Sequence, residues 1–149
     1  MMVTQKSQYA LRALFELATR LDSGPVRIED IAKAQAIPQR FLEVVLNELK
    51  HAGLVEARRG PRGGYMLARN PRDITVADVI ECCQGRFTPV DCLSDPGSAD
   101  CSFKGDCAFV SLWEEVREAV NHVYGSTTLH DLVTREEARL MKASLNYSI

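Results

Sequence analysis

Long hydrophobic runs are missing from this sequence of 149 residues. No stretch approaches the roughly 20 apolar residues that a membrane-spanning helix needs. The N-terminus also lacks the basic, apolar and small-residue pattern of a secretory signal. A composition of 46% hydrophobic and 26% charged residues is typical of a globular chain. We therefore expect a soluble, cytoplasmic protein with no membrane partner.

Signatures of catalysis are missing as well. The sequence contains no nucleotide-binding glycine loop, no triad pattern and no paired-carboxylate site. Its three histidines, at positions 51, 122 and 130, are scattered rather than clustered. No internal repeat is evident, and the length suits one ordinary domain or two small lobes. We therefore expect that this chain is not an enzyme.

Cysteines are few, and their odd number of five argues against a simple disulfide framework. Three of them, Cys92, Cys101 and Cys107, lie in one segment rich in Gly, Pro, Ser and Asp, which predicts a loop. A loop allows several sulfur atoms to converge, and in the cytoplasm clustered thiols favour metal, cluster or redox chemistry. An iron–sulfur cluster, a zinc site and a bare thiol switch remain open. Zinc is disfavoured because it usually has four protein ligands at short paired spacings.

The other two cysteines, Cys82 and Cys83, are adjacent on a predicted helix. Neighbouring helical residues point about 100° apart, so both cannot easily serve one site. We expect them to be small hydrophobic residues in the core.

Positive charge is scarce in the second half of the chain. Residues 1–72 contain 12 Lys and Arg against 7 Asp and Glu, whereas residues 73–149 contain 6 against 13. A basic first half beside an acidic second half fits a nucleic-acid-binding lobe joined to a non-binding lobe. Chance clustering of charge on solvated faces is the alternative explanation.

Hydrophobic periodicity predicts three helices followed by a hairpin. The expected helices are 4–21, 28–35 and 38–51, the strands 54–57 and 65–68, and the later helices 76–82, 107–124, 127–133 and 135–143. Gly125 is expected to end the long helix. The pattern predicts a mainly α fold with a small β-hairpin wing, which is a winged helix-turn-helix whose third helix enters the major groove. The expected divisions are 1–72 for DNA binding, 73–106 for a linking helix and cysteine loop, and 107–149 for the final helices.

Basic and polar residues gather where such a fold meets DNA. Arginines beside Gly and Pro in the wing suit a narrow minor groove and phosphates, and the start of the third helix suits base edges. Phe41 is expected in the core. The expected DNA contacts are Thr4, Lys6, Pro38, Gln39, Arg40, Glu43, Arg58, Arg59, Gly60 and Arg62.

The long helix carries an apolar stripe that must be buried against something. Its residues recur at intervals of three and four. They are Phe109, Leu112, Trp113, Val116, Val120 and Val123.

These motifs together resemble the Rrf-type family of bacterial winged-helix transcriptional regulators, which includes IscR, NsrR, RirA and CymR. The wing motif, RGPRGGYML at 59–67, is the most specific of them. The other matching stretches are 9–14 (YALRAL), 24–26 (GPV), 37–43 (IPQRFLE), 52–55 (AGLV), 74–80 (ITVADVI), 112–113 (LW) and 128–132 (TLHDL).

The resemblance implies a homodimer built around the apolar stripe of the 107–124 helix, bound to a roughly palindromic operator in double-stranded DNA. It implies that Arg59 enters the minor groove and that residues 38–43 read the major groove. It also implies that Cys92, Cys101 and Cys107 hold an iron–sulfur cluster, either [2Fe-2S] or [4Fe-4S].

The fourth ligand of such a cluster is left open by the resemblance. Positions that supply it in cluster-binding relatives correspond here to Gln8 and Val110. Asp91, Asp106, a group of the partner chain or an exogenous molecule are the alternatives.

Three functions therefore compete. The leading hypothesis is a homodimeric regulator whose operator affinity follows an iron–sulfur cluster that senses iron, redox state or nitric oxide. A cluster-free regulator of the same fold, controlled by a protein partner or by cysteine oxidation, is the alternative. A small metal-carrier or electron-transfer protein, with the basic half as a docking face, is the third.

Overall fold

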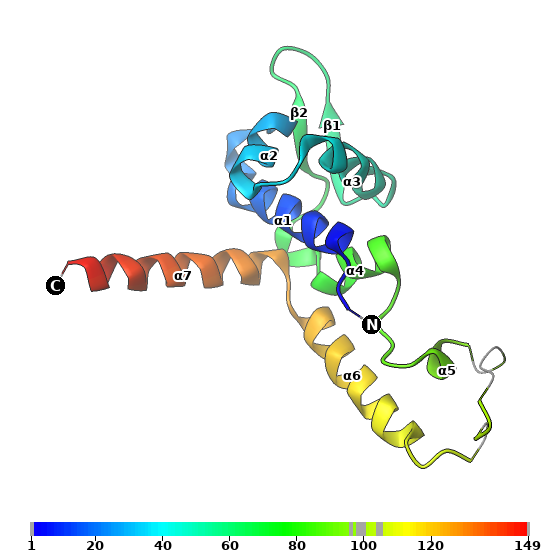
Figure 1. Cartoon of the computed structure of the whole chain (residues 1–149). Helices are drawn as coiled ribbons and strands as arrows, with labels where there is room; N and C mark the ends of the chain where they lie inside the picture. The colour runs from blue at the N-terminus through cyan, green and yellow to red at the C-terminus, as the bar shows by residue number, and fades with distance from the viewer. Residues whose placement is uncertain (1, 96, 98–100, 104–105, 149) are drawn as a thin grey trace.

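The computed structural model describes residues 2–95, 97, 101–103 and 106–148. Figure 1 shows a head of helices and a hairpin, from which α6 (Val110–Ser126) and α7 (Leu129–Tyr147) extend in different directions. The described part of residues 86–109, here called the cysteine segment, lies beside α6, away from the head. None of the described helices is both long and apolar enough to cross a bilayer.

The head begins with α1 (Gln5–Thr19), η1 (Leu21–Ser23), α2 (Ile28–Gln35) and α3 (Gln39–His51). Ala36 takes a left-handed φ of 51°, which ends α2 and turns the chain sharply into α3. The three predicted helices are thus confirmed, with α1 slightly shorter than expected and α3 starting one residue later.

One hydrophobic cluster holds the head together. Leu14 of α1, Ile31 of α2 and Leu46 of α3 are fully buried in it. Ile74 and Leu129, which come from later in the chain, are fully buried in the same cluster. Each such side chain stabilises the fold by about 2 kcal/mol through removal from water, so the first turn of α7 is anchored to the head.

The wing is an antiparallel hairpin of β1 (Val55–Arg58) and β2 (Gly64–Leu67), as predicted. Its base is fixed by a bridge in which Val26 and Tyr65 each donate an N–H to the other's carbonyl at 2.8 Å. A Cβ at Gly64 would lie 2.4 Å from the carbonyl oxygen of Val26. Only glycine permits this close approach, which sets the direction in which the wing leaves the head.

After η2 (Pro71–Asp73), α4 (Val76–Gln84) packs against α1, α3 and α6. Thr75 and Asp78 form a capping box at its start. The helix continues two residues beyond the predicted end. The reason is tertiary, because the side-chain oxygen of Gln84 accepts the N–H of Thr4 at 2.8 Å and the hydroxyl of Ser7 at 2.6 Å.

Both predicted ends of the long helix are wrong. The long helix does not end at Gly125 but continues to Ser126, and it begins at Val110 rather than at Cys107. Gly125 lacks the left-handed φ of a terminating glycine. The helix ends instead because Val76 donates its N–H to Thr127 at 2.8 Å, which pulls the chain into an extended bridge.

The two predicted final helices are a single helix, α7. Thr134, at the expected break, donates its hydroxyl to the carbonyl of His130 at 3.0 Å. This bond within the helix lets a β-branched residue remain in its interior. As a result α7 projects well beyond the head (Figure 1).

Candidate DNA-binding face and cysteine segment

The outward face of α3 carries the predicted base-reading residues. Gln39, Arg40 and Glu43 are exposed, and Pro38 is the exposed N-cap. Among the described residues, no side chain caps this helix end, which leaves its first N–H groups available to a phosphate. The opposite face, with Leu42 and its neighbours, is buried in the core.

The sequence did not identify every outward residue of α3. Phe41 was expected in the core, but 56% of its surface is exposed. Val44, which lies one turn beyond Arg40, is exposed to the same degree. Helical spacing could have identified Val44, because positions 40, 44 and 47 lie on the side of α3 opposite its buried residues.

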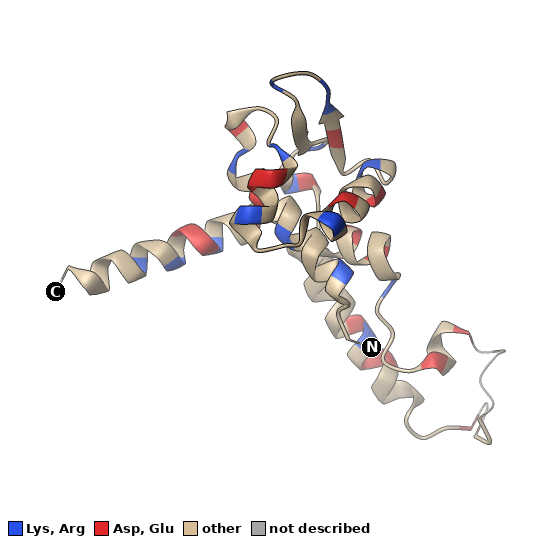
Figure 2. Cartoon of the chain, turned by 45° about the horizontal axis from the view of Figure 1, so that its top comes forward, with Lys and Arg blue, Asp and Glu red and all other residues tan. Residues whose placement is uncertain are grey.

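The predicted wing residues lie at the end of the hairpin. Arg58, Arg59 and Arg62 are all exposed, and Figure 2 shows Lys and Arg on both sides of this loop. Gly60, with a φ of 105°, accepts the N–H of Gly63 at 2.9 Å and tightens the turn. Arg58 pairs weakly with Glu56 at 3.6 Å. Within the described residues, no ion pair engages the other two arginines, so their charge is available to DNA.

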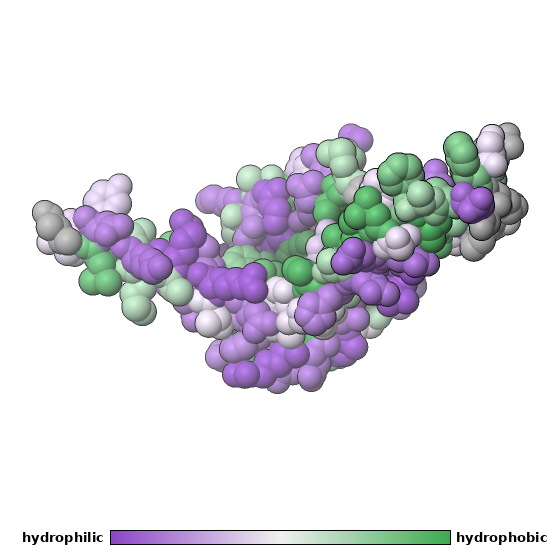
Figure 3. Space-filling view, turned by 90° about the horizontal axis from the view of Figure 1, so that it is seen from below, coloured by the Kyte–Doolittle hydropathy of each residue, from purple (hydrophilic) through white to green (hydrophobic). Residues whose placement is uncertain are grey.

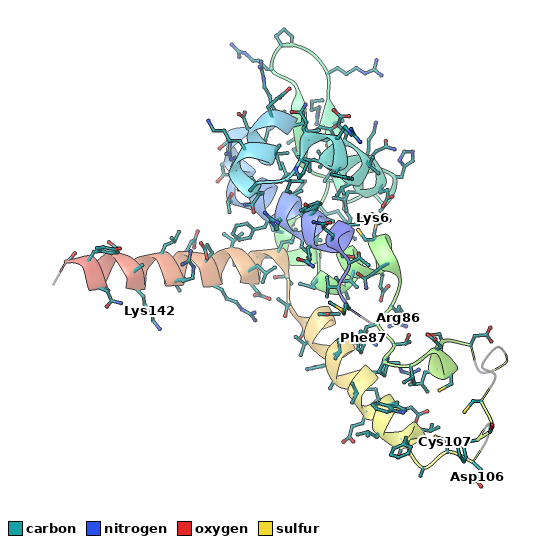
Figure 4. All side chains as sticks on the ribbon, in the orientation of Figure 1. Lys6, Arg86, Phe87, Asp106, Cys107 and Lys142 are labelled. Atoms are coloured by element: carbon teal, nitrogen blue, oxygen red, sulfur yellow. The ribbon has the colours of Figure 1, made fainter. Side chains whose placement is uncertain are left out.

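The predicted contacts at the start of α1 are tied to other helices. Thr4 uses its hydroxyl to cap α1, accepting the N–H of Ser7 at 3.2 Å. Lys6 forms an ion pair with Glu48 of α3 at 3.2 Å, and Figure 4 shows it between the two helices. Lys6 therefore ties α1 to α3, whereas Thr4 ties the start of α1 to α4 through its N–H bond to Gln84. A role in contacting phosphates remains a prediction for them.

The three cysteines of the cysteine segment are free and reachable. Cys92 lies half-buried on the short helix α5 (Asp91–Ser94), which corrects the expectation that the whole segment is a loop. Cys101 is exposed, and Cys107 is half-buried just before α6. In the part of the chain that is described, no three His, Cys, Asp or Glu side chains are gathered as a metal site. In this fold, Cys92, Cys101 and Cys107 are therefore not gathered into one site.

Cys82 and Cys83 have a different environment. Cys83 is buried in the core cluster, and Cys82 is half-buried against it. Burial, followed by the nearby Cys82 and Glu48, raises the pKa of Cys83 to about 11. Burial also raises the pKa of Cys82. Both thiols are therefore held in the unreactive protonated form, as expected for small core residues.

The apolar stripe of α6 divides into two faces. Trp113, Val116 and Val120 are half-buried, on the side that meets the rest of the chain. Leu112 and Val123 are exposed, as is Phe109, which is the N-cap rather than a helical residue. Seen from below, hydrophobic residues gather in the region of α6, between α7 and the cysteine segment (Figure 3). The face of α6 that carries Leu112 and Val123 has no partner within the described chain.

A hollow of about 690 Å³ separates the cysteine segment from α6. Leu93 and Ser94, next to Cys92, line one side, and Arg117 and Asn121 of α6 line the other. Asn121 bridges the two by donating to the carbonyl of Phe87 at 3.2 Å. Figure 4 shows Phe87 alongside α6 and Cys107 at its far end. The start of the cysteine segment is thereby joined to α6.

Comparison with known proteins identifies relatives of this architecture. The family described as "Rrf2: Iron-dependent Transcriptional regulator" matches residues 3–135. The chain is 35% identical over 134 residues to the HTH-type transcriptional regulator CymR of Bacillus subtilis, covering 90% of this chain and 91% of that one. It is 34% identical over 137 residues to IscR of Xenorhabdus nematophila, covering 92% and 82%.

Solved structures agree with the sequence relatives. The structure of CymR (YrzC), the global cysteine regulator of B. subtilis, superimposes with a TM-score of 0.78 at 32% identity, covering 91% of this chain and 98% of that one. IscR of T. potens superimposes with a TM-score of 0.75 at 34% identity, covering 93% and 90%. The predicted mainly α, winged-helix fold is confirmed, and the chain belongs to the Rrf2 family of DNA-binding transcriptional regulators.

Proposed function

We propose that this protein is a homodimeric transcriptional regulator whose operator affinity is controlled by an iron–sulfur cluster bound to Cys92, Cys101 and Cys107. The observation that carries the proposal is the state of these thiols. All three are free and at least partly exposed, in a segment next to the helix that leads out of the head. Buried structural cysteines, such as Cys83, have the opposite character.

The donor set suits an iron–sulfur cluster. Thiolates are the usual ligands of such clusters, and Asp91 and Asp106 offer exposed carboxylates for a fourth position. A bound cluster supplies a centre that responds to iron, redox state or nitric oxide. Because the cysteines are not gathered beforehand, binding must draw α5 and the residues before α6 together. The cluster would then stabilise one arrangement of the segment over another.

Coupling to DNA follows from the packing. The cysteine segment contacts α6 through Asn121 and Phe87, α6 packs on α4, and α4 packs on α1 and α3. In a dimer joined along the exposed face of α6, this path sets the separation of two α3 helices, which must enter major grooves about one turn apart. A coupling of about 1–3 kcal/mol would change operator affinity about 5- to 150-fold.

The wing completes the proposed interface. Arg59 would enter the minor groove, while Arg58, Gly60 and Arg62 would meet phosphates. Pro38, Gln39, Arg40 and Glu43 would face the bases, and Thr4 and Lys6 would lie near the DNA backbone at the start of α1. All three wing arginines are exposed, and of these only Arg58 forms an ion pair among the described residues, which supports this arrangement.

The test is anaerobic reconstitution with iron and sulfide, followed by absorption spectroscopy and metal analysis. We expect about one coloured cluster per chain, lost when Cys92, Cys101 and Cys107 are replaced by Ser. A Cys83→Ser variant is the matched control and should retain iron. Operator binding by loaded and stripped protein is then compared in gel shifts. Equal affinity of the two forms would contradict control by a cluster.

A cluster-free regulator is the second candidate. The separation of the three cysteines and the 35% identity to CymR favour it. In that case oxidation of exposed Cys101, or a protein partner, would set DNA affinity. A colourless protein after reconstitution, whose DNA binding changes with peroxide, would select thiol oxidation. Regulation that persists in the triple serine variant would select a partner.

A further inference from the structure

The outward face of α3 contains two apolar side chains at its centre and edge. Phe41 and Val44 each expose 56% of their surface, although they flank the polar residues Arg40 and Glu43. Val44 lies only about 40° around the helix axis from Arg40, because four residues turn the helix by about 400°. Arg40 and Val44 therefore share one face of α3, one turn apart, so they can approach neighbouring base pairs.

Phe41 and Val44 also border a shallow hollow of about 420 Å³ between α3 and the start of α1. Tyr9 and Val45 contribute to its lining, and Gln5 and Lys6 complete it. The side chains of this hollow are mainly apolar, with one cation, Lys6, held in place by Glu48 at 3.2 Å. This combination suits a small apolar group that lies close to a phosphate backbone.

The major groove presents one apolar group of this kind. Thymine projects a C5-methyl group, and none of the other three bases carries a methyl group at its major-groove edge. 5-Methylcytosine carries the same methyl at the same carbon. An exposed valine and phenylalanine gain nothing from the polar edges but gain apolar contact from a pyrimidine methyl.

We propose that Val44 and Phe41 are specificity-determining residues that recognise the C5-methyl group of a pyrimidine, normally thymine, in each operator half-site. This inference rests on the proposed placement of α3 in the major groove. It explains why two hydrophobic side chains remain in solvent on the face of the head that carries the base-reading residues. It also predicts a readout that hydrogen-bonding residues such as Gln39 and Arg40 cannot give.

The experiment replaces single methyl groups in DNA. Duplexes are selected from a random pool with the purified full-length protein, in both stripped and reconstituted form. Each thymine of the selected site is then replaced by uracil, incorporated as deoxyuridine, which lacks only the methyl group. We expect at least one position per half-site at which the Kd rises about fourfold, the value for burial of one methyl group. At that position, a cytosine–guanine pair is then compared with a 5-methylcytosine–guanine pair. A lower Kd for the methylated pair shows that the methyl group itself is recognised.

Variants assign the effect to the two side chains. In the Val44→Ala and Phe41→Ala proteins, the ratio of the Kd for the uracil duplex to the Kd for the thymine duplex should fall toward one. Leu140→Ala changes a residue on α7 that is 54% exposed, and this variant should keep the fourfold ratio. Equal Kd values for the thymine and uracil duplexes at every position would overturn the inference while leaving DNA binding intact. If both alanine variants kept the fourfold Kd ratio, other residues would recognise the methyl group, and the inference would also be overturned. Failure to select any duplex would instead reject the DNA-binding function itself.

Discussion

The head and the cysteine segment with α6 are built in opposite ways. Helices α1 and α3 bury seven and four residues respectively, whereas α6 buries none of its residues. The head is therefore fixed by its own core, and its DNA-binding face is formed in the isolated chain. Helices α5 and α6 bury none of their residues, so less apolar packing holds them in place. The fold thus combines a well-packed head with a loosely packed segment, which the proposed function assigns to control.

Removing core volume from the head should have the largest effect. Leu46 is fully buried, so Leu46→Ala should lower the free energy of unfolding by about 3 kcal/mol. Leu140→Ala, on the exposed part of α7, should change it by less than about 0.5 kcal/mol. Urea denaturation followed by circular dichroism measures both. Similar losses in the two variants would contradict the contrast between the regions.

The reactivity of cysteine thiols should also differ strongly between the head, which contains Cys83, and the cysteine segment, which contains Cys101. A pKa of about 11 leaves about one in a thousand Cys83 side chains as the reactive thiolate at pH 8. Exposed Cys101 lacks this protection by burial. Iodoacetamide should label exposed Cys101 faster than buried Cys83, as measured by peptide mass spectrometry. Because the thiolate form of Cys83 grows as pH rises toward 11, labelling of Cys83 should speed up with increasing pH.

The exposed face of α6 should control assembly without controlling folding. Leu112→Glu places a charge in the proposed dimer interface and should weaken dimerisation by at least about thirtyfold. Analytical ultracentrifugation measures the change, and circular dichroism should show unchanged helix content. Leu140→Glu is the matched control on α7. An undiminished dimer in the Leu112 variant would place the interface elsewhere.

Loss of one wing cation should have a smaller effect. Arg59→Ala should weaken binding to a selected duplex about tenfold and reduce the slope of log K against log salt by about 1. Lys142→Ala removes the same charge from α7, which projects away from the wing (Figure 4), and should leave both quantities unchanged. Fluorescence anisotropy at several salt concentrations gives the two slopes. Equal slopes in the two variants would remove Arg59 from the interface.

The smallest effect is expected at the joint between the regions. Thr75 caps α4, accepting the N–H of Asp78 at 3.1 Å. Thr75→Ala should lower the free energy of unfolding by about 1 kcal/mol, while Thr75→Ser should retain most of it. Chemical denaturation of the three proteins provides the comparison. No loss in the alanine variant would mean that the backbone bridge to Thr128 alone fixes this joint.

Much of the head was predictable because its information is local. Helical spacing identified the buried leucines of α3, and the glycines of the wing identified the hairpin. Phe41 was misassigned because a hydrophobic residue at the edge of a buried stripe can face either way. The distances among the three cysteines were not predictable, since loop composition sets neither the path nor the ends of the chain around them.

The sequence alone determined the order of the elements, the wing motif, the basic first half and the three thiols of the cysteine segment. Tertiary structure decided where α4 and α6 end, that α7 is a single helix, and which residues of the α6 stripe remain exposed. The physical reason is that periodicity and turn residues act within a few positions of the chain. By contrast, the hydrogen bonds of Gln84 and Thr127 join residues that only the folded core brings together.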